Sequence, residues 1–504
     1  MLAQRSFVIL LSRVFGAILG LIGLFFITRH LGPEVYGTVS WALAFVAIFN
    51  TFAELGFNSA HIKRVSEGKS LEDCIATYTV IKLLLIGVMV TLTFSYILAL
   101  SLLGYGLSWS SIQVVLLFVV YYIFYDLANI TWTTYEARLE SAKSQLITLA
   151  DPLVRIPLIV LISLYGLGAF EIAGAYAVGG SVMIVVGLIF FFRDRIRWKR
   201  PTLFRSYIKF AIPVTFITVF GSISWNLDKI LISSFDSNAS VGFFNSSQLL
   251  LGVVGFIGVA VSTITFPAFS KLISEGRMKA VKEMTWLAER YISIIGLPLI
   301  VATVVAPTEI AVTLFGQNFA PAGIAMRYLA IGTFASMLTQ AYVPQIVAMD
   351  RPGILARLNG YVLVLNFTLL LLFIPSQLAG VPMLGLGFEG AAMVNIITSF
   401  TYLAYVIFMA HRLTGTAPNP RLLLHLVAAG LTAVVLTLTL SIWAIQQWYD
   451  LVMFGFYTIG IFAALLASLK ELTWADVKYL LSVINPSILA GYISGEIKQK
   501  EQKK

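Results

Sequence analysis

A long uncharged run dominates this sequence: no side chain from Leu83 to Tyr125 carries a charge. Apolar runs of similar composition recur along the chain, and only 12% of its 504 residues are charged, against about 25% in soluble domains. A helix needs roughly 20 apolar residues to cross the hydrocarbon core of a bilayer. The pattern therefore predicts a multi-pass membrane protein.

About fourteen stretches are long and apolar enough to cross the bilayer as helices. They lie at 7–28, 36–60, 78–101, 112–135, 144–165, 170–192, 207–234, 239–268, 287–306, 325–347, 354–375, 387–410, 422–445 and 450–469. These runs are too long for barrel strands, and helices satisfy their own backbone groups in lipid. We therefore predict an all-α polytopic fold.

The basic residues fall in alternate gaps between these stretches. They lie at 62–73, 136–143, 193–209, 271–290, 350–357 and 411–421 and in the tail from Lys470, whereas 102–111, 166–171, 235–240, 376–389 and 446–450 have none. Basic loops stay in the cytoplasm, so we expect both termini there and the protein in the cell membrane. The net charge of +10 then reflects topology, and we expect no nucleic-acid partner.

The basic segment around residue 195 divides the chain into two comparable halves. We predict a six-helix lobe at 1–195, a second at 196–412, two additional transmembrane helices at 413–470 and a cytoplasmic amphipathic, basic tail at 471–504. Leu472 to Leu481 has the pattern of a short amphipathic helix, with Thr473 as its N-cap.

The two halves resemble each other at one turn. Leu31–Gly37 joins the first span to the second, Phe235–Phe244 joins the seventh to the eighth, and Gly37 and Gly242 hold equivalent positions. Both halves start in the cytoplasm, so the repeat is parallel. Lobes related in this way occur in one class of secondary transporters, and we expect a central cavity between them.

Ionisable side chains inside spans are rare and usually face the bundle interior. Here they share helix faces with other polar residues, which predicts a wet cavity of mixed charge. Asp126 has no basic neighbour on its own helix and is the strongest candidate for a protonatable or cation-binding carboxylate. Asp151 and Arg155 are four residues apart and could instead neutralise each other. Arg13 could extend to the membrane interface.

Several kinds of chemistry have no support in the sequence. There is no GxxxxGK[ST] phosphate loop, so an ion gradient, the membrane potential or the substrate gradient must drive any transport. Cys74 is the only cysteine, which rules out an intrachain disulfide. The four histidines are scattered and no nucleophile motif is present. We expect no enzyme activity, no cofactor and no metal site.

Two motifs carry a family resemblance. Arg29-His30-Leu31-Gly32-Pro33-Glu34-Val35-Tyr36-Gly37 resembles the "R-x-L-G-P-E-x-Y-G" signature of prokaryotic polysaccharide-biosynthesis membrane proteins. Asp228-Lys229-Ile230-Leu231-Ile232, followed by Val241-Gly242-Phe243-Phe244, is similar to their second-half pattern, with Phe in place of Tyr. These are repeat-unit flippases, in the superfamily that includes the MATE multidrug exporters and the lipid II flippases.

The resemblance implies a flippase that moves a polyprenyl-phosphate-linked oligosaccharide from the cytoplasmic to the outer leaflet by alternating access. Arg155, Lys229, Arg13 and Arg29 would then bind the substrate phosphate, and Asp126, Asp228, Glu54 and Asp151 would exchange H⁺ or Na⁺. Arg29 could instead hold the outer loop through Glu34.

Two alternatives remain on the same scaffold. One is a cation-coupled multidrug or small-molecule antiporter, whose cavity would be lined mainly by acidic and aromatic groups. The other is a non-transporting scaffold of a glycan-assembly complex. If the protein is a flippase, we expect it to bind membrane lipids and the lipid-linked oligosaccharide. A glycan polymerase or glycosyltransferases are further candidate partners.

Overall fold

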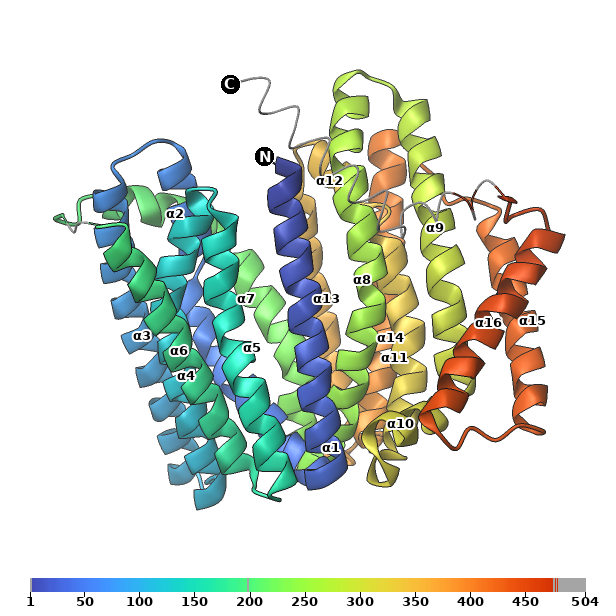
Figure 1. Ribbon diagram of the computed structural model, residues 1–504, viewed down its shortest axis with the longest axis horizontal. Helices are drawn as coiled ribbons and strands as arrows, with labels where there is room; N and C mark the ends of the chain where they lie inside the picture. Colours follow the sequence, from blue (N-terminus) through green and yellow to red (C-terminus); the bar gives the residue numbers. More distant parts are fainter. Residues whose placement is uncertain (1, 197–198, 475, 477, 479–504) are drawn as a thin grey trace.

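The protein is described here from a computed structural model. The described backbone comprises residues 2–196, 199–474, 476 and 478, and the described side chains begin at Ser12 and leave out those of Arg13 and of residues 213, 216–217 and 352. Figure 1 shows a bundle of long, roughly parallel helices.

The helices have the following bounds: α1 (Leu2–Glu54), α2 (Phe57–Ser66), α3 (Leu71–Leu102), α4 (Trp109–Ala137), α5 (Ser141–Leu164), α6 (Ala169–Arg193), α7 (Phe204–Phe235), α8 (Asn238–Ser274), α9 (Met278–Val305), α10 (Pro307–Phe315), α11 (Ala322–Thr339), α12 (Val343–Ala348), α13 (Pro352–Phe373), α14 (Gly387–Thr414), α15 (Leu422–Leu440) and α16 (Trp448–Ser468). A short 3₁₀ helix, η1, spans Gln317–Phe319, and two short antiparallel strands, β1 (Gln377–Leu378) and β2 (Val381–Pro382), form a small hairpin.

The predicted membrane spans are confirmed as helices. Among the described residues, 12 helical segments are long and apolar enough to cross a membrane. The first of them, Val14–Ser66, contains two predicted spans, because the chain reverses at Gly32, where φ is 79°. The predicted span at 207–234 corresponds to α7. Every predicted span therefore has a helical counterpart.

The chain reversal in α1 defines two ends of the bundle. The first half of α1 runs from the end that holds α2 and α12, here called the α2 end, to the end that holds α10, called the α10 end (Figure 1). The second half of α1 then returns towards α2. The positive-inside pattern assigns the α2 end to the cytoplasm, which stays a prediction.

Helix packing forms two groups. Helices α3 to α6 pack on one another and on α1, whereas α8, α9, α11, α13 and α14 pack together, with α15 and α16 added against α9. Helix α1 contacts members of both groups. Helix α7 packs on α8, α13 and α14 of the second group and reaches α3 of the first through the Tyr207 hydroxyl, which donates to the backbone oxygen of Cys74. The predicted boundaries of the two lobes remain a prediction, but α1 and α7 are the helices that join the groups.

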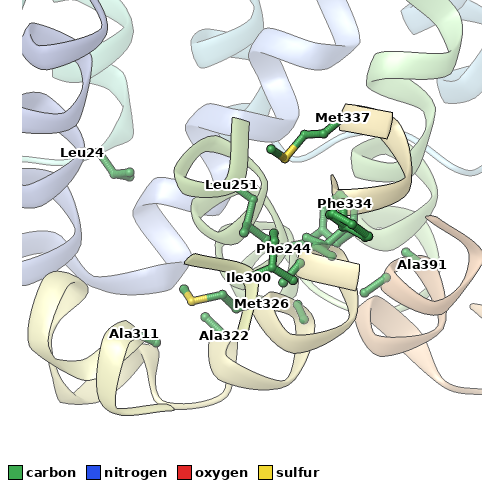
Figure 2. Close-up of a cluster of buried hydrophobic side chains, with 14 of the residues drawn as sticks. Leu24, Phe244, Leu251, Ile300, Ala311, Ala322, Met326, Phe334, Met337 and Ala391 are labelled. Atoms are coloured by element: carbon green, nitrogen blue, oxygen red, sulfur yellow. The ribbon is translucent and has the colours of Figure 1, made fainter. Parts of the chain in front are cut away.

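The largest buried apolar cluster extends over both groups of helices and has most of its members in the second. Phe244 and Leu251 of α8, Ile300 of α9, and Phe334 and Met337 of α11 belong to one buried cluster, part of which is drawn in Figure 2. Dispersion contacts are individually weak but numerous in such a cluster. This packing makes the second group of helices compact, and α1 and α7 lie against it.

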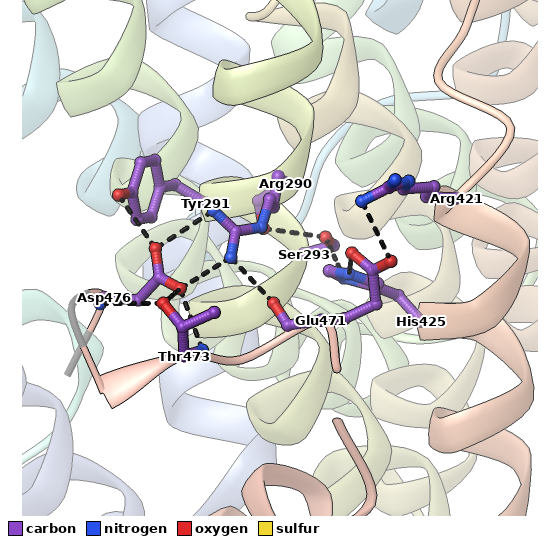
Figure 3. Close-up of polar contacts among 8 residues, drawn as sticks. All are labelled: Arg290, Tyr291, Ser293, Arg421, His425, Glu471, Thr473 and Asp476. Atoms are coloured by element: carbon purple, nitrogen blue, oxygen red, sulfur yellow. Dashed lines mark hydrogen bonds and ion pairs between the residues drawn. The ribbon is translucent and has the colours of Figure 1, made fainter. Parts of the chain in front are cut away.

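The described part of the C-terminal tail folds back onto α9 and α15 (Figure 3). Arg290 donates to both carboxylate oxygens of Asp476, at 3.0 and 2.6 Å, and to the backbone oxygen of Glu471 at 2.8 Å. As predicted, Thr473 caps this segment, since its hydroxyl accepts from the Asp476 amide at 3.4 Å. Most of the predicted tail at 471–504 lies outside the described residues.

This contact perturbs one titratable group outside the spans. Burial alone would raise the pKa of Asp476, but hydrogen bonds from Arg290 and Thr473 outweigh it and lower the pKa to about 2. Asp476 is therefore ionised at every physiological pH, and the ion pair with Arg290 holds the tail segment against α9.

Candidate functional site

Lys229 lies on α7, one of the two helices that contact both groups. Its side chain is buried, with 4% of the residue exposed, and its ammonium donates to the backbone oxygen of Trp225 at 3.0 Å. No carboxylate forms an ion pair with it among the described residues. The Trp225 ring is 5.6 Å from the ammonium and 58% exposed. The neighbouring Asp228 acts on Lys229 electrostatically but forms no ion pair with it. A buried cation with no paired anion is unfavourable in lipid, so this position favours an anionic ligand.

Asp228 precedes Lys229 but points to a different helix. It is 7% exposed and accepts a long hydrogen bond, 3.5 Å, from the amide of Asn366 on α13. Adjacent residues on a helix point in different directions, and of this pair Asp228 is the one that bonds to a side chain of another helix. A carboxylate beside a carboxamide oxygen offers ligands suited to a hard cation.

Arg155 and Asp151 neutralise each other on α5. The guanidinium donates to the carboxylate through Nε at 2.9 Å and through Nη2 at 2.9 Å, and it stacks 4.1 Å from the Tyr176 ring centroid on α6. Helix α6 makes room with Gly179, where a Cβ would lie 2.2 Å from the Asp151 carboxylate. The sequence left open whether Asp151 and Arg155 face a cavity or neutralise each other, and in the structure they form an ion pair.

Asp126 also has a cationic partner, but on a neighbouring helix. Lys82 of α3 forms an ion pair with Asp126 of α4 at 2.8 Å, and both side chains are fully buried. Lys82 also donates to the backbone oxygen of Ala53 at 3.0 Å. The second carboxylate oxygen of Asp126 is buried without a hydrogen-bond partner. Glu54 interacts electrostatically with both groups.

Arg29 contacts α10, which packs on α9 and α11 of the second group, and forms no ion pair with Glu34. Its guanidinium donates to the backbone oxygens of Thr313 and Leu314, in the last turn of α10, and lies 4.7 Å from the Phe25 ring. Carbonyls in the last turn of a helix lack partners within the helix. Arg29 therefore acts as a C-cap for α10 that ties α1 to it.

The equivalent turns of the two halves meet at the α10 end. A Cβ on Gly37 would lie 1.6 Å from the backbone oxygen of Asn238, and one on Gly242 would lie 2.4 Å from that of Pro33. Asn245 of α8 donates to the Tyr36 hydroxyl at 2.7 Å. The predicted equivalence of Gly37 and Gly242 thus corresponds to a direct contact that closes the α10 end between α1 and α8.

An apolar cavity of about 340 Å³ lies beside Arg29, since Phe25 and Leu314, which Arg29 contacts, form part of its wall. It is formed by α1, α8 and α10, and its wall includes Ile18, Phe25, Leu250 and Phe315. The cavity is partly open and its lining is almost wholly apolar, which suits a hydrocarbon chain. Arg13, another predicted phosphate ligand, has a side chain outside the described residues.

Sequence reasoning missed Lys82 and Glu289. Lys82 lies just before the uncharged run that begins at Leu83, and its place within the predicted span at 78–101 was the available signal. Glu289, 1% exposed on α9, accepts from the Tyr342 hydroxyl and, at 2.9 Å, from the Asn419 amide. It lies in a predicted span beside Arg290, and only tertiary structure reveals its partners.

With this geometry in place, comparison with known proteins assigns the family. The model of the family described as "Polysaccharide biosynthesis protein" matches residues 2–273. The chain belongs to this family. It is also 21% identical over 416 residues, 82% of this chain and 84% of the other, to a protein of Haloferax volcanii described as the probable low-salt glycan biosynthesis flippase Agl15.

Solved structures show the same fold. A lipid II flippase, MurJ, in an inward closed conformation aligns with a TM-score of 0.73 at 17% identity over 91% of this chain and 98% of that one. An inward-facing MATE-family multidrug resistance transporter of the MOP superfamily aligns with a TM-score of 0.61 at 15% identity, covering 80% and 96%. This polysaccharide biosynthesis family member therefore has the fold of MOP-superfamily transporters.

Proposed function

We propose that this protein is a flippase that moves a lipid-linked oligosaccharide from the cytoplasmic to the outer leaflet by alternating access. The load is a sugar headgroup joined through phosphate to a polyprenyl chain. Such a headgroup does not cross hydrocarbon unaided, because removing charge and hydroxyl groups from water is very unfavourable. Membership of the polysaccharide biosynthesis family and the likeness to Agl15 support this substrate class.

The observation that carries the proposal is the unpaired ammonium of Lys229. It is buried on a helix that contacts both groups, and its one recorded acceptor is a backbone oxygen. A phosphate bound there would supply the missing negative charge. The exposed ring of Trp225 beside it offers a flat surface for a sugar, and the apolar cavity along α1 suits the polyprenyl chain.

The other predicted phosphate ligands enter the proposal differently. Arg155 keeps donors beyond those that hold Asp151, so we assign it to a supporting role at the headgroup. Arg29 holds α10, and we assign it to closing the α10 end. Arg13 stays a proposed ligand on the strength of its sequence position alone.

For ion coupling we propose two separate carboxylates. Asp228 with Asn366 lies at the junction of α7 and α13, and Asp126 with Glu54 lies between α1, α3 and α4. Asp151 is held by Arg155 and would act only if that ion pair opened. In this proposal the protein transports its substrate and catalyses no covalent step.

The test is export of the glycan in cells that carry Lys229→Met. A charge-assisted hydrogen bond contributes about 1.5–3 kcal/mol, so we expect export to fall by about tenfold to a hundredfold while the protein reaches the membrane. Lys229→Arg should retain part of the activity. The matched control is Lys271→Met, since the Lys271 side chain is 76% exposed. Normal export by Lys229→Met would contradict the assignment.

A further inference from the structure

Helix α1 ends at Glu54 and α2 begins at Phe57, inside the second predicted span. Leu55 and Gly56 separate them with positive φ values of 37° and 73°. The break is packed against α7, since a Cβ on Gly56 would lie 2.8 Å from the Val214 side chain. Backbone carbonyls freed by such a break need partners when they lie in the membrane.

Two side chains supply those partners. Lys82 of α3 donates to the backbone oxygen of Ala53 at 3.0 Å, and Thr215 of α7 donates to that of Leu55 at 2.8 Å. Lys82 also holds Asp126 of α4 at 2.8 Å. One ammonium therefore ties the end of α1 to both α3 and α4.

The cluster around this tether contains one cation and two carboxylates. Asp126 takes the ion pair with Lys82, whereas Glu54, the last residue of α1, forms no ion pair or hydrogen bond among the described side chains. Asp126 and Lys82 are fully buried. Glu54 is half-buried. A net charge of −1 so largely removed from water is unfavourable, and binding one proton brings the cluster to neutrality. The unpartnered carboxylate oxygen of Asp126 is a second place where a proton can be held.

Among the residues that the structure describes, Lys82 is the one cation that acts on these two carboxylates. The titratable groups that interact with Glu54 and Asp126 from the packed helices are the hydroxyls of Tyr78 on α3 and of Tyr122 and Tyr125 on α4. These are neutral at ordinary pH. The competition between Glu54 and Asp126 for the ammonium of Lys82 therefore determines the position of Lys82.

We infer that Glu54, Lys82 and Asp126 form a proton-binding switch that sets the angle between α1 and α2. With the proton on Glu54, Lys82 holds Asp126 and the Ala53 carbonyl, as in this structure. When Glu54 releases its proton to water as the pH rises, its carboxylate competes with Asp126 and with the Ala53 carbonyl for the Lys82 ammonium and weakens both contacts. The step releases one proton from the cluster, so its equilibrium shifts with pH, and only the O–H bond of Glu54 and the contacts of Lys82 change.

A change in the angle of α2 would alter the contacts of α2 at the α2 end. His61 of α2 bonds to the Tyr207 hydroxyl of α7 at 2.9 Å, and that hydroxyl donates to the backbone oxygen of Cys74 at 3.2 Å. Cys74 is fully buried and is the only cysteine of the chain. Movement of α2 about the break would uncover Cys74, so the native thiol reports the state of the switch.

The experiment measures the rate of maleimide labelling of Cys74 in the reconstituted protein between about pH 5 and pH 9, corrected for the known pH dependence of thiolate formation on a model thiol. We expect the corrected rate to rise at least fivefold as the pH increases. Glu54→Gln mimics the protonated residue and should keep the rate low at every pH. Lys82→Met should give a high rate at every pH.

Controls separate the switch from loss of folding. Removing Lys82 alone leaves Asp126 unpaired, so the double variant Lys82→Met/Asp126→Asn, which removes both charges, is measured as well and should also label rapidly at every pH. Glu289→Gln changes a buried carboxylate in the second group and should leave the pH response of Cys74 unchanged.

A corrected rate that does not change with pH, or an unchanged pH response in Glu54→Gln, would overturn the inference. A response to Na⁺ at constant pH in place of a pH response would overturn the assignment to protons. The inference rests on the proposed function, because the switch would serve transport, but the labelling experiment needs no substrate. A switch that works in a protein that exports no glycan would therefore refute the proposed substrate alone.

Discussion

The backbone oxygen of Asn238 lies where a side chain on Gly37 would begin, since a Cβ at Gly37 would be 1.6 Å away. The two residues belong to the equivalent turns of the two halves. Glycine at this position is therefore a condition for closing the α10 end, and α1 and α8 meet there backbone to backbone.

We predict that Gly37→Ala prevents this closure. Overpacking at a tight contact typically costs about 1–3 kcal/mol, which shifts the balance towards states open at the α10 end by about fivefold to a hundredfold. Export should fall, and a cysteine placed at Asn245 in a Cys74→Ala background should label faster. Gly20→Ala, on the same helix with nothing within 4 Å of its Cβ, should behave as the parent protein.

A second prediction separates the two roles considered for Arg29. If Arg29 closes the α10 end by capping α10, Arg29→Lys loses the paired donation to Thr313 and Leu314 and should label faster at Asn245, like Gly37→Ala. If Arg29 mainly binds phosphate, Arg29→Lys keeps the charge and should change substrate affinity without changing this labelling. The measurement is the same cysteine labelling, with and without substrate.

A third prediction concerns Asp228. Asn366→Leu removes its hydrogen-bond partner while keeping a similar volume, so binding of a coupling cation should weaken by about tenfold, the equivalent of about 1.4 kcal/mol. The check is the cation concentration that gives half-maximal transport. Thr368→Val, at an exposed position of the same helix whose hydroxyl bonds to its own backbone, is the control. An unchanged cation dependence in Asn366→Leu would exclude Asp228 from coupling.

A fourth prediction is a pH dependence at the tail. The pKa of Asp476 is lowered to about 2, so its ion pair with Arg290 stabilises the docked segment fully above the ordinary carboxyl pKa of about 4. This contribution is lost only as the pH falls towards about 2. Titration of Asp476 should therefore leave the protection of residues 469–474 from hydrogen exchange unchanged between about pH 5 and pH 8.

Asp476→Asn should release the segment at neutral pH, because hydrogen bonds to a charged partner contribute about 1.5–3 kcal/mol. Exchange at 469–474 should then accelerate by about tenfold or more. Glu275→Gln removes only exposed ion pairs and serves as the control. Equal exchange in Asp476→Asn and the parent protein would show that apolar contacts alone hold the segment.

The helices were predictable because length and apolar composition alone determine them in lipid. The sequence also predicted the equivalence of Gly37 and Gly242, since similar turns preceded similar apolar runs. It did not predict that the two glycines touch, because a contact between distant segments depends on how the lobes are oriented. The cap that Arg29 gives α10 was missed for the same reason.

The candidate site was predictable only in part. Polar spacing placed Asp126 and Lys229 on interior faces of their helices, and both are buried. Their partners came from other helices or from the backbone: Lys82 for Asp126 and the Trp225 carbonyl for Lys229. Only the Asp151–Arg155 pair, four residues apart on α5, had a partner that helix geometry alone could identify.

The central claim is that a phosphate-bearing lipid crosses the membrane by way of Lys229. The most direct test is flipping of a short-chain polyprenyl-diphosphate oligosaccharide in proteoliposomes, followed by its protection from a lectin added outside. We predict that the parent protein and Lys271→Met transfer the lipid between leaflets and that Lys229→Met does so at least tenfold more slowly. Equal rates in Lys229→Met and the parent protein, or no transfer above protein-free liposomes in any of them, would contradict the account.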